Sequence, residues 1–149
     1  MKLKESIIID RAIEIVWDHV QDPYYMKKWN PRVKNIIPLP ETFPGIGYKF
    51  KTEYEMMGSP DLFNAEIIEY KKPKSILIRY KNTTGKFPGY ILEKFELKET
   101  NNGTLLSRYI DFSKSGLNLS LRLLLYLLGI LGRPIGNKYL SRLKKLVEC

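Results

Sequence analysis

The sequence contains very little of the chemistry that metal centres and nucleophilic catalysis require. Its 149 residues include one histidine, His19, and one cysteine, Cys149. A zinc site needs several clustered His, Cys or carboxylate ligands, and a catalytic triad needs a histidine base beside its nucleophile. His19 falls on a short predicted helix, where an exposed histidine is the ordinary interpretation. We therefore expect no metal, no cofactor and no catalytic residue.

Signals for export or for membrane insertion are also missing. A lone cysteine cannot close an internal disulfide, which is typical of proteins in reducing compartments. The segment Met1–Glu5 is charged where a signal peptide would need an apolar core. The most apolar stretch, Leu117–Leu131, has about fifteen residues, whereas a membrane-spanning helix needs about twenty. We expect a cytoplasmic protein, in which this stretch is buried or lies peripherally on a membrane.

The chain lacks a phosphate-binding loop but carries an excess of positive charge. Gly45-Ile46-Gly47 has no third glycine and does not open a predicted helix. Lys and Arg number 25 and Asp and Glu 16, for a net charge of +9, which favours acidic partners. The lysines are scattered, so we interpret them as a solvated cationic surface. The aromatic residues that could stack on bases are also the only candidate core, and we expect no nucleic-acid partner.

The apolar pattern of the first thirty residues predicts a strand and two short helices. Ser6–Ile9 is a β-type run, and Asp10 after it is a good helix N-cap. Apolar residues then recur at three-to-four spacing through Ala12–Val20, as on an amphipathic helix. Asp22 and the proline after it restart a helix that we expect to end near Trp29.

After Trp29 the spacing of the apolar residues changes to every second position. Between Tyr48 and Met56 an aromatic face alternates with a charged one, which is typical of a half-buried strand. Asn101-Asn102-Gly103 predicts a hairpin turn, because an Asn-Gly pair tolerates positive φ. The expected strands are Val33–Leu39, Tyr48–Met56, Leu62–Tyr70, Ser75–Lys81, Tyr90–Lys98 and Thr104–Phe112. The remainder, Leu117–Glu148, is predicted to be helical, with an interruption by glycines and a proline.

This order of elements predicts an α+β domain that spans residues 1–149. Sequential hairpins imply a seven-stranded antiparallel sheet, and the long C-terminal helix must cover one of its faces. A curved sheet of this width offers more concave surface than one helix can fill. We therefore expect a cavity between the sheet and the helix.

Several motifs resemble the START/polyketide cyclase-like superfamily, also known as SRPBCC, which includes the birch-pollen-allergen group. They cover nearly the whole chain and comprise Ile7–Trp29, Ala65–Glu69, Ile76–Ile78, Gly103-Thr104 and Leu143–Glu148. The resemblance implies the helix-grip fold, in which the curved sheet wraps around the long C-terminal helix and two short helices follow the first strand. It also implies a position for Trp29 near the mouth of the pocket. Members of such a fold transport, cyclise, hydrolyse or regulate, so the fold alone does not name the activity.

The predicted hairpin sets a register that brings two opposite charges together. If Glu99 lies near Thr104, Phe95 falls opposite Arg108, and Glu93 becomes the diagonal neighbour of Arg108. On the concave side, in a low dielectric, this pair could bind the polar end of a ligand or act as an acid and base. With the faces reversed, both residues would be surface charges.

The tyrosines on the predicted strands could orient a ligand through their hydroxyl groups, or could simply pack in the core or at its rim. Trp29 could likewise border the pocket or anchor the second short helix. Our candidate ligand-binding residues are Trp29, Tyr48, Phe50, Tyr54, Tyr80, Glu93, Phe95 and Arg108.

Three functions fit these observations. The first is binding or transport of a hydrophobic small molecule, such as a lipid, an isoprenoid or a polyketide-like compound. The second is an enzyme of the polyketide cyclase/dehydratase kind, with Glu93, Arg108 or a tyrosine as its acid–base group. The third is a membrane- or ribosome-associated interaction protein of the coenzyme Q-binding kind. There the Leu117–Leu131 helix would meet an anionic membrane surface or the second copy of a homodimer.

Overall fold

The structure, a computed structural model, describes residues 2–38, 44–55, 59–85, 87–120, 123–124 and 137–149. They contain a seven-stranded antiparallel sheet with the strand order β1-β7-β6-β5-β4-β3-β2. The strands are β1 (Lys2–Ile9), β2 (Val33–Pro38), β3 (Lys49–Glu55), β4 (Pro60–Lys71), β5 (Ser75–Asn82), β6 (Ile91–Thr100) and β7 (Gly103–Asp111). The described helices are α1 (Ile13–Val20), the 3-10 helix η1 (Pro23–Tyr25), α2 (Met26–Trp29) and α4 (Asn137–Glu148).

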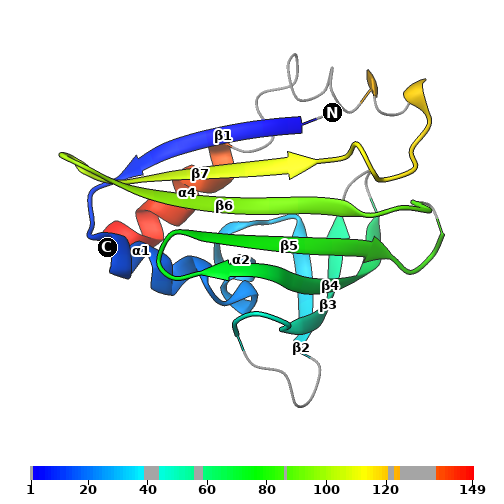
Figure 1. Cartoon of the computed structure of the whole chain (residues 1–149), viewed down its shortest axis with the longest axis horizontal. Coiled ribbons are helices and arrows are strands. Elements are labelled where there is room, and N and C mark those ends of the chain that lie inside the picture. The colour runs from blue at the N-terminus through cyan, green and yellow to red at the C-terminus, as the bar shows by residue number, and fades with distance from the viewer. Residues whose placement is uncertain (1, 39–43, 56–58, 86, 121–122, 125–136) are drawn as a thin grey trace.

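The three α-helices lie together on one side of the curved sheet (Figure 1). α4 packs against β1 and α2, and α1 packs against β6 and β7. This arrangement confirms the predicted α+β helix-grip fold, including the two short helices that follow the first strand.

Irregularities in the strand pairing coincide with the curvature of the sheet. The register between β4 and β5 shifts between Ile67 and Glu69, and that between β2 and β3 shifts between Val33 and Asn35. An extra residue on one strand bends that strand and increases its local twist. The bends help the β2–β3–β4 end of the sheet to turn over the helices instead of lying flat.

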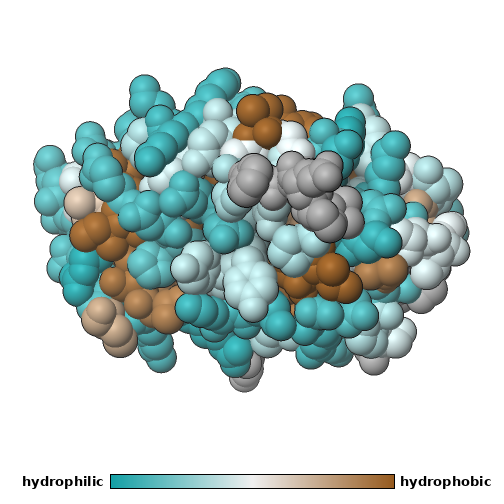
Figure 2. Space-filling view, turned by 90° about the horizontal axis from the view of Figure 1, so that it is seen from below, coloured by the Kyte–Doolittle hydropathy of each residue, from teal (hydrophilic) through white to brown (hydrophobic). Residues whose placement is uncertain are grey.

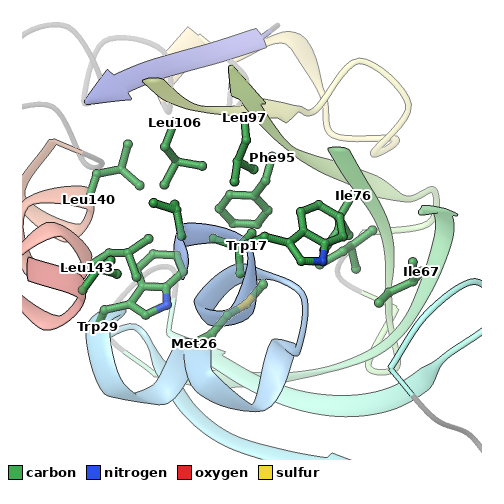
Figure 3. Packing of buried hydrophobic residues seen from close by; sticks show 14 of the residues in the cluster. Trp17, Met26, Trp29, Ile67, Ile76, Phe95, Leu97, Leu106, Leu140 and Leu143 are labelled. Atoms are coloured by element: carbon green, nitrogen blue, oxygen red, sulfur yellow. The ribbon is translucent and has the colours of Figure 1, made fainter. Parts of the chain in front are cut away.

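The main core fills the space between the concave face of the sheet and the helices (Figure 3). Successive side chains of a strand point to opposite faces, so a regular strand can direct only every second residue toward this core, as Ile76 and Ile78 of β5 do. Trp17 of α1, together with Leu140 and Leu143 of α4, is fully buried among them. Burying a side chain of the size of leucine contributes about 1.5–3 kcal/mol, so this apolar face holds the helices on the sheet.

The two short helices begin differently. We expected Asp10 to cap the first one, and this prediction is wrong: α1 begins at Ile13, and Ala12 before it has no side-chain acceptor. The backbone N–H of Asp10 instead donates to the Glu148 carboxylate at 2.8 Å, which ties the end of β1 to the end of α4. Asp22 caps η1 as predicted, since its side chain accepts a backbone N–H there.

Much of the predicted C-terminal helix that precedes α4 lies outside the described residues. We expected helix throughout Leu117–Glu148, and the structure describes helix at 119–120, at 123–124 and in α4. The expected interruption by glycines and a proline also lies outside them. No helix among the described residues is long and apolar enough to cross a membrane. The face of the molecule shown in Figure 2 is largely hydrophilic, with separate hydrophobic patches.

The hairpin predicted at Asn101–Gly103 joins β6 to β7, where Thr100 pairs with Gly103. Gly103 has a φ of +119°, and a Cβ atom at this position would collide with the carbonyl oxygen of Ile9. A glycine is therefore required for two reasons, its backbone angle and the close approach of β1.

We expect Gly103→Ala to lower the free energy of unfolding by about 3 kcal/mol or more, because backbone strain and steric overlap add together. Gly85→Ala is the matched control: Gly85 has a φ of +80°, but apart from its chain neighbours no described residue has an atom within 4 Å of a Cβ atom there. This control should lose only about 1–2 kcal/mol. Denaturant titrations measure both losses. Equal losses would contradict the claim that the contact with Ile9 excludes a side chain.

Candidate ligand-binding site

A small hollow lies between the main core and a second apolar cluster. Its volume is about 50 Å³. The second cluster consists of Phe63, Phe87, Ile91, Phe112 and Leu117, of which Phe63, Ile91 and Phe112 line the hollow. The side chains that line the hollow come from β3 to β7 and from the residue that follows β7, and they are Tyr54, Phe63, Tyr80, Ile91, Glu93, Arg108, Ile110 and Phe112.

Strand register places the polar members of this lining next to one another. In the pairing of β6 with β7, Phe95 lies opposite Arg108 and Glu93 opposite Ile110, as the hairpin predicted. Glu93 is thus the diagonal neighbour of Arg108. In the pairing of β5 with β6, Tyr80 lies opposite Ile91, so Glu93 is also its diagonal neighbour. Diagonal neighbours on one face are within reach of long side chains.

The three polar side chains form a connected, buried network. The guanidinium Nε of Arg108 donates to Glu93 Oε1 at 2.6 Å. The Tyr80 hydroxyl donates to the other oxygen, Oε2, at 2.7 Å. Arg108 is 1% exposed and Glu93 5% exposed, so of the two placements that the sequence left open, the buried one is observed. Charge-assisted hydrogen bonds of this length are among the strongest in proteins.

A further carboxylate reaches the same guanidinium from the edge strand. Glu5 of β1 lies opposite Arg108 of β7, and Arg108 Nη1 donates to Glu5 Oε1 at 3.2 Å. The second oxygen of Glu5, Oε2, is buried and has no hydrogen-bond partner among the described residues. The network that we call the Arg108 cluster therefore contains Arg108, Glu5, Glu93 and Tyr80.

The protonation of the cluster follows from its burial. Burial raises the pKa of the Glu5 carboxyl group, and the attraction of Arg108 only partly opposes it. Burial also raises the pKa of Tyr80, and the neighbouring Glu93 carboxylate raises it further. Burial is the largest single effect on Arg108 and lowers its pKa, but the interactions with Glu93, Tyr54 and Glu5 together outweigh it, and the net change is upward. Tyr80 is thus a neutral donor and Arg108 a permanent cation.

Aromatic rings surround the guanidinium. Its carbon lies 5.9 Å from the centroid of the Trp29 ring and 6.0 Å from that of Phe95. Trp29 and Phe95 themselves pack edge to face, with their ring centroids 6.0 Å apart. A cation beside an aromatic face is attracted by the quadrupole of the ring, which adds to the stabilisation of Arg108 in this apolar setting.

The structure brings together four of the eight candidate ligand-binding residues. Tyr54, Tyr80, Glu93 and Arg108 line the hollow. The other four belong to the main core, and all are at most 4% exposed: Trp29, Tyr48, Phe50 and Phe95. Trp29 is 1% exposed and contacts Phe95, so the structure places it inside this core. A role of any of these residues in ligand binding stays a prediction.

Some lining residues escaped the sequence reasoning. Ile110 and Phe112 continue the alternation that begins at Arg108, so extending that face by two steps would have found them. Phe63, another lining residue, is the second residue of the strand predicted over Leu62–Tyr70. Glu5 lies before the run Ser6–Ile9 from which the first strand was predicted, and no local signal marks it as a partner of Arg108.

The remaining candidates for catalysis lie elsewhere. His19 is on α1, and its Nδ1 lies 2.8 Å from the carbonyl oxygen of Ile15 in the same helix. Cys149 is exposed at the end of α4. The part of the chain that the structure describes holds no group of three His, Cys, Asp or Glu side chains arranged to bind a metal ion.

An antiparallel sheet curved around a C-terminal helix, with a polar cluster facing an apolar hollow, defines a helix-grip protein. The model of the family described as polyketide cyclase / dehydrase and lipid transport matches residues 1–148. The chain belongs to this family, which confirms the resemblance seen in the sequence. None of the curated proteins matches the chain.

Solved structures share the fold at low sequence identity. The ginseng major latex-like protein 151 from Panax ginseng has a TM-score of 0.71 at 15% identity, over 98% of this chain and 96% of that one. Protein CV1439 from Chromobacterium violaceum has a TM-score of 0.68 at 16% identity, over 99% and 97%. Ara h 8.0201 has a TM-score of 0.67 at 12% identity, over 99% and 97%. Likenesses at these identities show the fold.

The raised pKa of Glu5 makes stability depend on pH in a defined direction. In the unfolded chain this carboxyl group titrates near 4.5, and in the folded protein it titrates higher. Between those two values the folded state binds more protons than the unfolded state, so ionisation of Glu5 costs stability as the pH rises.

We expect Glu5→Gln to remove this cost while keeping an oxygen that accepts from Arg108. The variant's gain in unfolding free energy over the wild type should be small below pH 4.5 and should grow as the pH rises through the folded pKa. Denaturant titrations from pH 4 to pH 8 measure this difference. Glu99→Gln, which removes an exposed carboxylate at the end of β6, is the control and should show no such growth. A Glu5→Gln difference that is constant with pH, or that falls, would refute the assignment.

Proposed function

We propose that this protein binds a hydrophobic small molecule, such as a lipid, an isoprenoid or a polyketide-like compound, and acts as its carrier or sensor. One observation carries the proposal: a buried ion pair, Arg108 with Glu93, faces a hollow whose other walls are mostly apolar. Binding sites of small molecules combine an apolar lining with a few polar groups that fix orientation. Membership of a family whose description includes lipid transport supports the same conclusion.

The size of the hollow decides which part of such a ligand it holds. Pockets for drug-sized ligands measure about 300–1,000 Å³, and this hollow measures about 50 Å³. It therefore takes one end of the ligand, and the Arg108 cluster makes the polar end the suitable one. The apolar body would lie against the apolar cluster that contains Phe63 and Phe112. Each Å² of apolar surface removed from water there contributes about 25 cal/mol.

A second candidate function is acid–base catalysis of the cyclase or dehydratase kind. It is favoured by the contact between the Tyr80 hydroxyl and the Glu93 carboxylate inside the hollow. A general base, however, needs an oxygen within hydrogen-bond reach of the proton that it removes. Both oxygens of Glu93 already accept hydrogen bonds, from Arg108 and from Tyr80. Binding therefore accounts for this arrangement more directly than catalysis does.

We further propose that the carrier acts in the cytoplasm and associates peripherally with an anionic membrane or with a second copy of itself. The peripheral association rests on the apolar segment Leu117–Leu131 and on the net charge of +9. Within the segment, Leu119, Leu123 and Leu124 are described and are 79%, 54% and 45% exposed. Exposed apolar side chains beside a cationic surface are features of segments that dock on anionic lipid.

Filling the hollow should weaken binding without disturbing the fold. We expect Ile110→Phe to weaken the binding of 1-hexanol by about tenfold or more, because the added ring occupies the space for the ligand. Chemical-shift changes of backbone amides during an NMR titration measure the affinity, and the same spectra show whether the variant is folded.

Ile37→Phe is the control for this experiment, since Ile37 lies on β2 and is 45% exposed. It should bind 1-hexanol as the wild type does. If the folded Ile110→Phe variant binds as tightly as the wild type, or if the wild type shows no shift changes at residues that line the hollow, the proposed function is wrong.

A further inference from the structure

The Arg108 cluster has the opposite charge imbalance to the whole protein. Two carboxylates, Glu5 and Glu93, share one guanidinium, Arg108, whereas the chain as a whole carries a net charge of +9. The outer surface therefore favours anions, and the buried cluster has one negative charge more than it has positive charges. A ligand that enters the hollow meets the second of these fields at close range and in a low dielectric.

The hydrogen bonds of the cluster show which kind of group it lacks. Nε and Nη1 of Arg108 already donate to Glu93 and Glu5. Glu93 accepts a second hydrogen bond from Tyr80. Glu5 Oε2 accepts none from any described residue, although its side chain is only 10% exposed. A buried acceptor without a donor costs free energy, and a carboxylate costs more than a neutral group.

The pairing of β1 with β7 relates Glu5, which carries the unpartnered oxygen Oε2, to the residues that line the hollow. Glu5 lies opposite Arg108, and Leu3, two residues before it, lies opposite Ile110. Arg108 and Ile110 both line the hollow. The unpartnered acceptor thus belongs to the same face of the sheet and to the neighbouring strand. A donor group that is brought to Arg108 and Glu93 lies within the field of both carboxylates.

We propose that the site selects ligands whose polar end is an organic amine, and discriminates against ligands that end in a carboxylate. This inference rests on the proposed function, since it names the chemical class of the ligand bound at the same hollow. A protonated amine supplies both missing features, one positive charge and several hydrogen-bond donors. An anionic end would meet the Glu93 carboxylate in the lining, and Glu93 and Glu5 together already exceed the single positive charge of Arg108. The raised pKa of Glu5 agrees with this direction, because it shows that burial disfavours the ionised carboxylate more than Arg108 favours it.

The test compares three probes that share one alkyl chain: hexylamine, 1-hexanol and hexanoate. At pH 7 the first is a cation and the last an anion. We expect hexylamine to bind about tenfold or more tightly than hexanoate, which corresponds to one hydrogen bond to a charged group. Isothermal titration calorimetry gives the affinities. The net charge of +9 alone predicts that hexanoate binds more tightly. Which of the two probes binds more tightly therefore shows whether the Arg108 cluster or the net charge of the protein governs binding.

Two variants assign the preference to the cluster. Glu5→Gln leaves one carboxylate for Arg108 and should reduce the preference for hexylamine about tenfold. Glu99→Gln removes the same formal charge from an exposed position and should leave it unchanged. A preference that survives Glu5→Gln overturns the assignment to the cluster.

The remaining outcomes separate this inference from the proposed function. If 1-hexanol binds at the hollow but hexanoate binds as tightly as hexylamine or more tightly, the selection for amines is wrong and the proposed function stands. If none of the three probes binds, both are wrong.

Discussion

The ion pair between Arg108 and Glu93 is the interaction on which the rest of the site depends. It joins β6 to β7, and through Glu5 and Tyr80 it reaches the edge strand β1 and β5. A buried charge left without its partner costs about 3–5 kcal/mol, which is a large part of the 5–15 kcal/mol that stabilises a typical domain. The hollow therefore keeps its polar wall only while this network stays intact.

The cluster also explains how a strongly cationic protein can hold an interior site of opposite character. Surface lysines act through water, where salt screens them within about 8–10 Å. The Glu5 and Glu93 carboxylates act across buried space beside the aromatic rings of Trp29 and Phe95. The cationic surface thus attracts anions at long range, whereas the Arg108 cluster favours cations at short range. The short-range effect determines which ligand stays bound in the hollow.

Much of the fold and half of the site followed from the sequence, because period-two alternation and one Asn-Gly turn determine the register of β6 and β7, although they left open which face of the sheet is buried. That register alone brought Glu93 and Arg108 together.

Glu5 could not be found in this way, since β1 pairs with β7 across about one hundred residues of chain and no local pattern encodes the pairing. The division between hollow and core is equally hidden: Phe50 and Tyr54 share one strand face, yet Phe50 packs in the core and Tyr54 lines the hollow. Asp10 looked like a cap, but the tertiary contact with Glu148 uses its backbone N–H instead.

The central claim is that the hollow beside Arg108 holds one end of a small molecule in the cell. Native mass spectrometry of freshly purified protein, set beside the same sample after denaturation, tests it most directly. The account predicts an additional mass on the native wild-type protein that disappears on denaturation and is much reduced in Ile110→Phe. The same excess of native over denatured mass in the wild type and in this variant, or no excess in either, would contradict it.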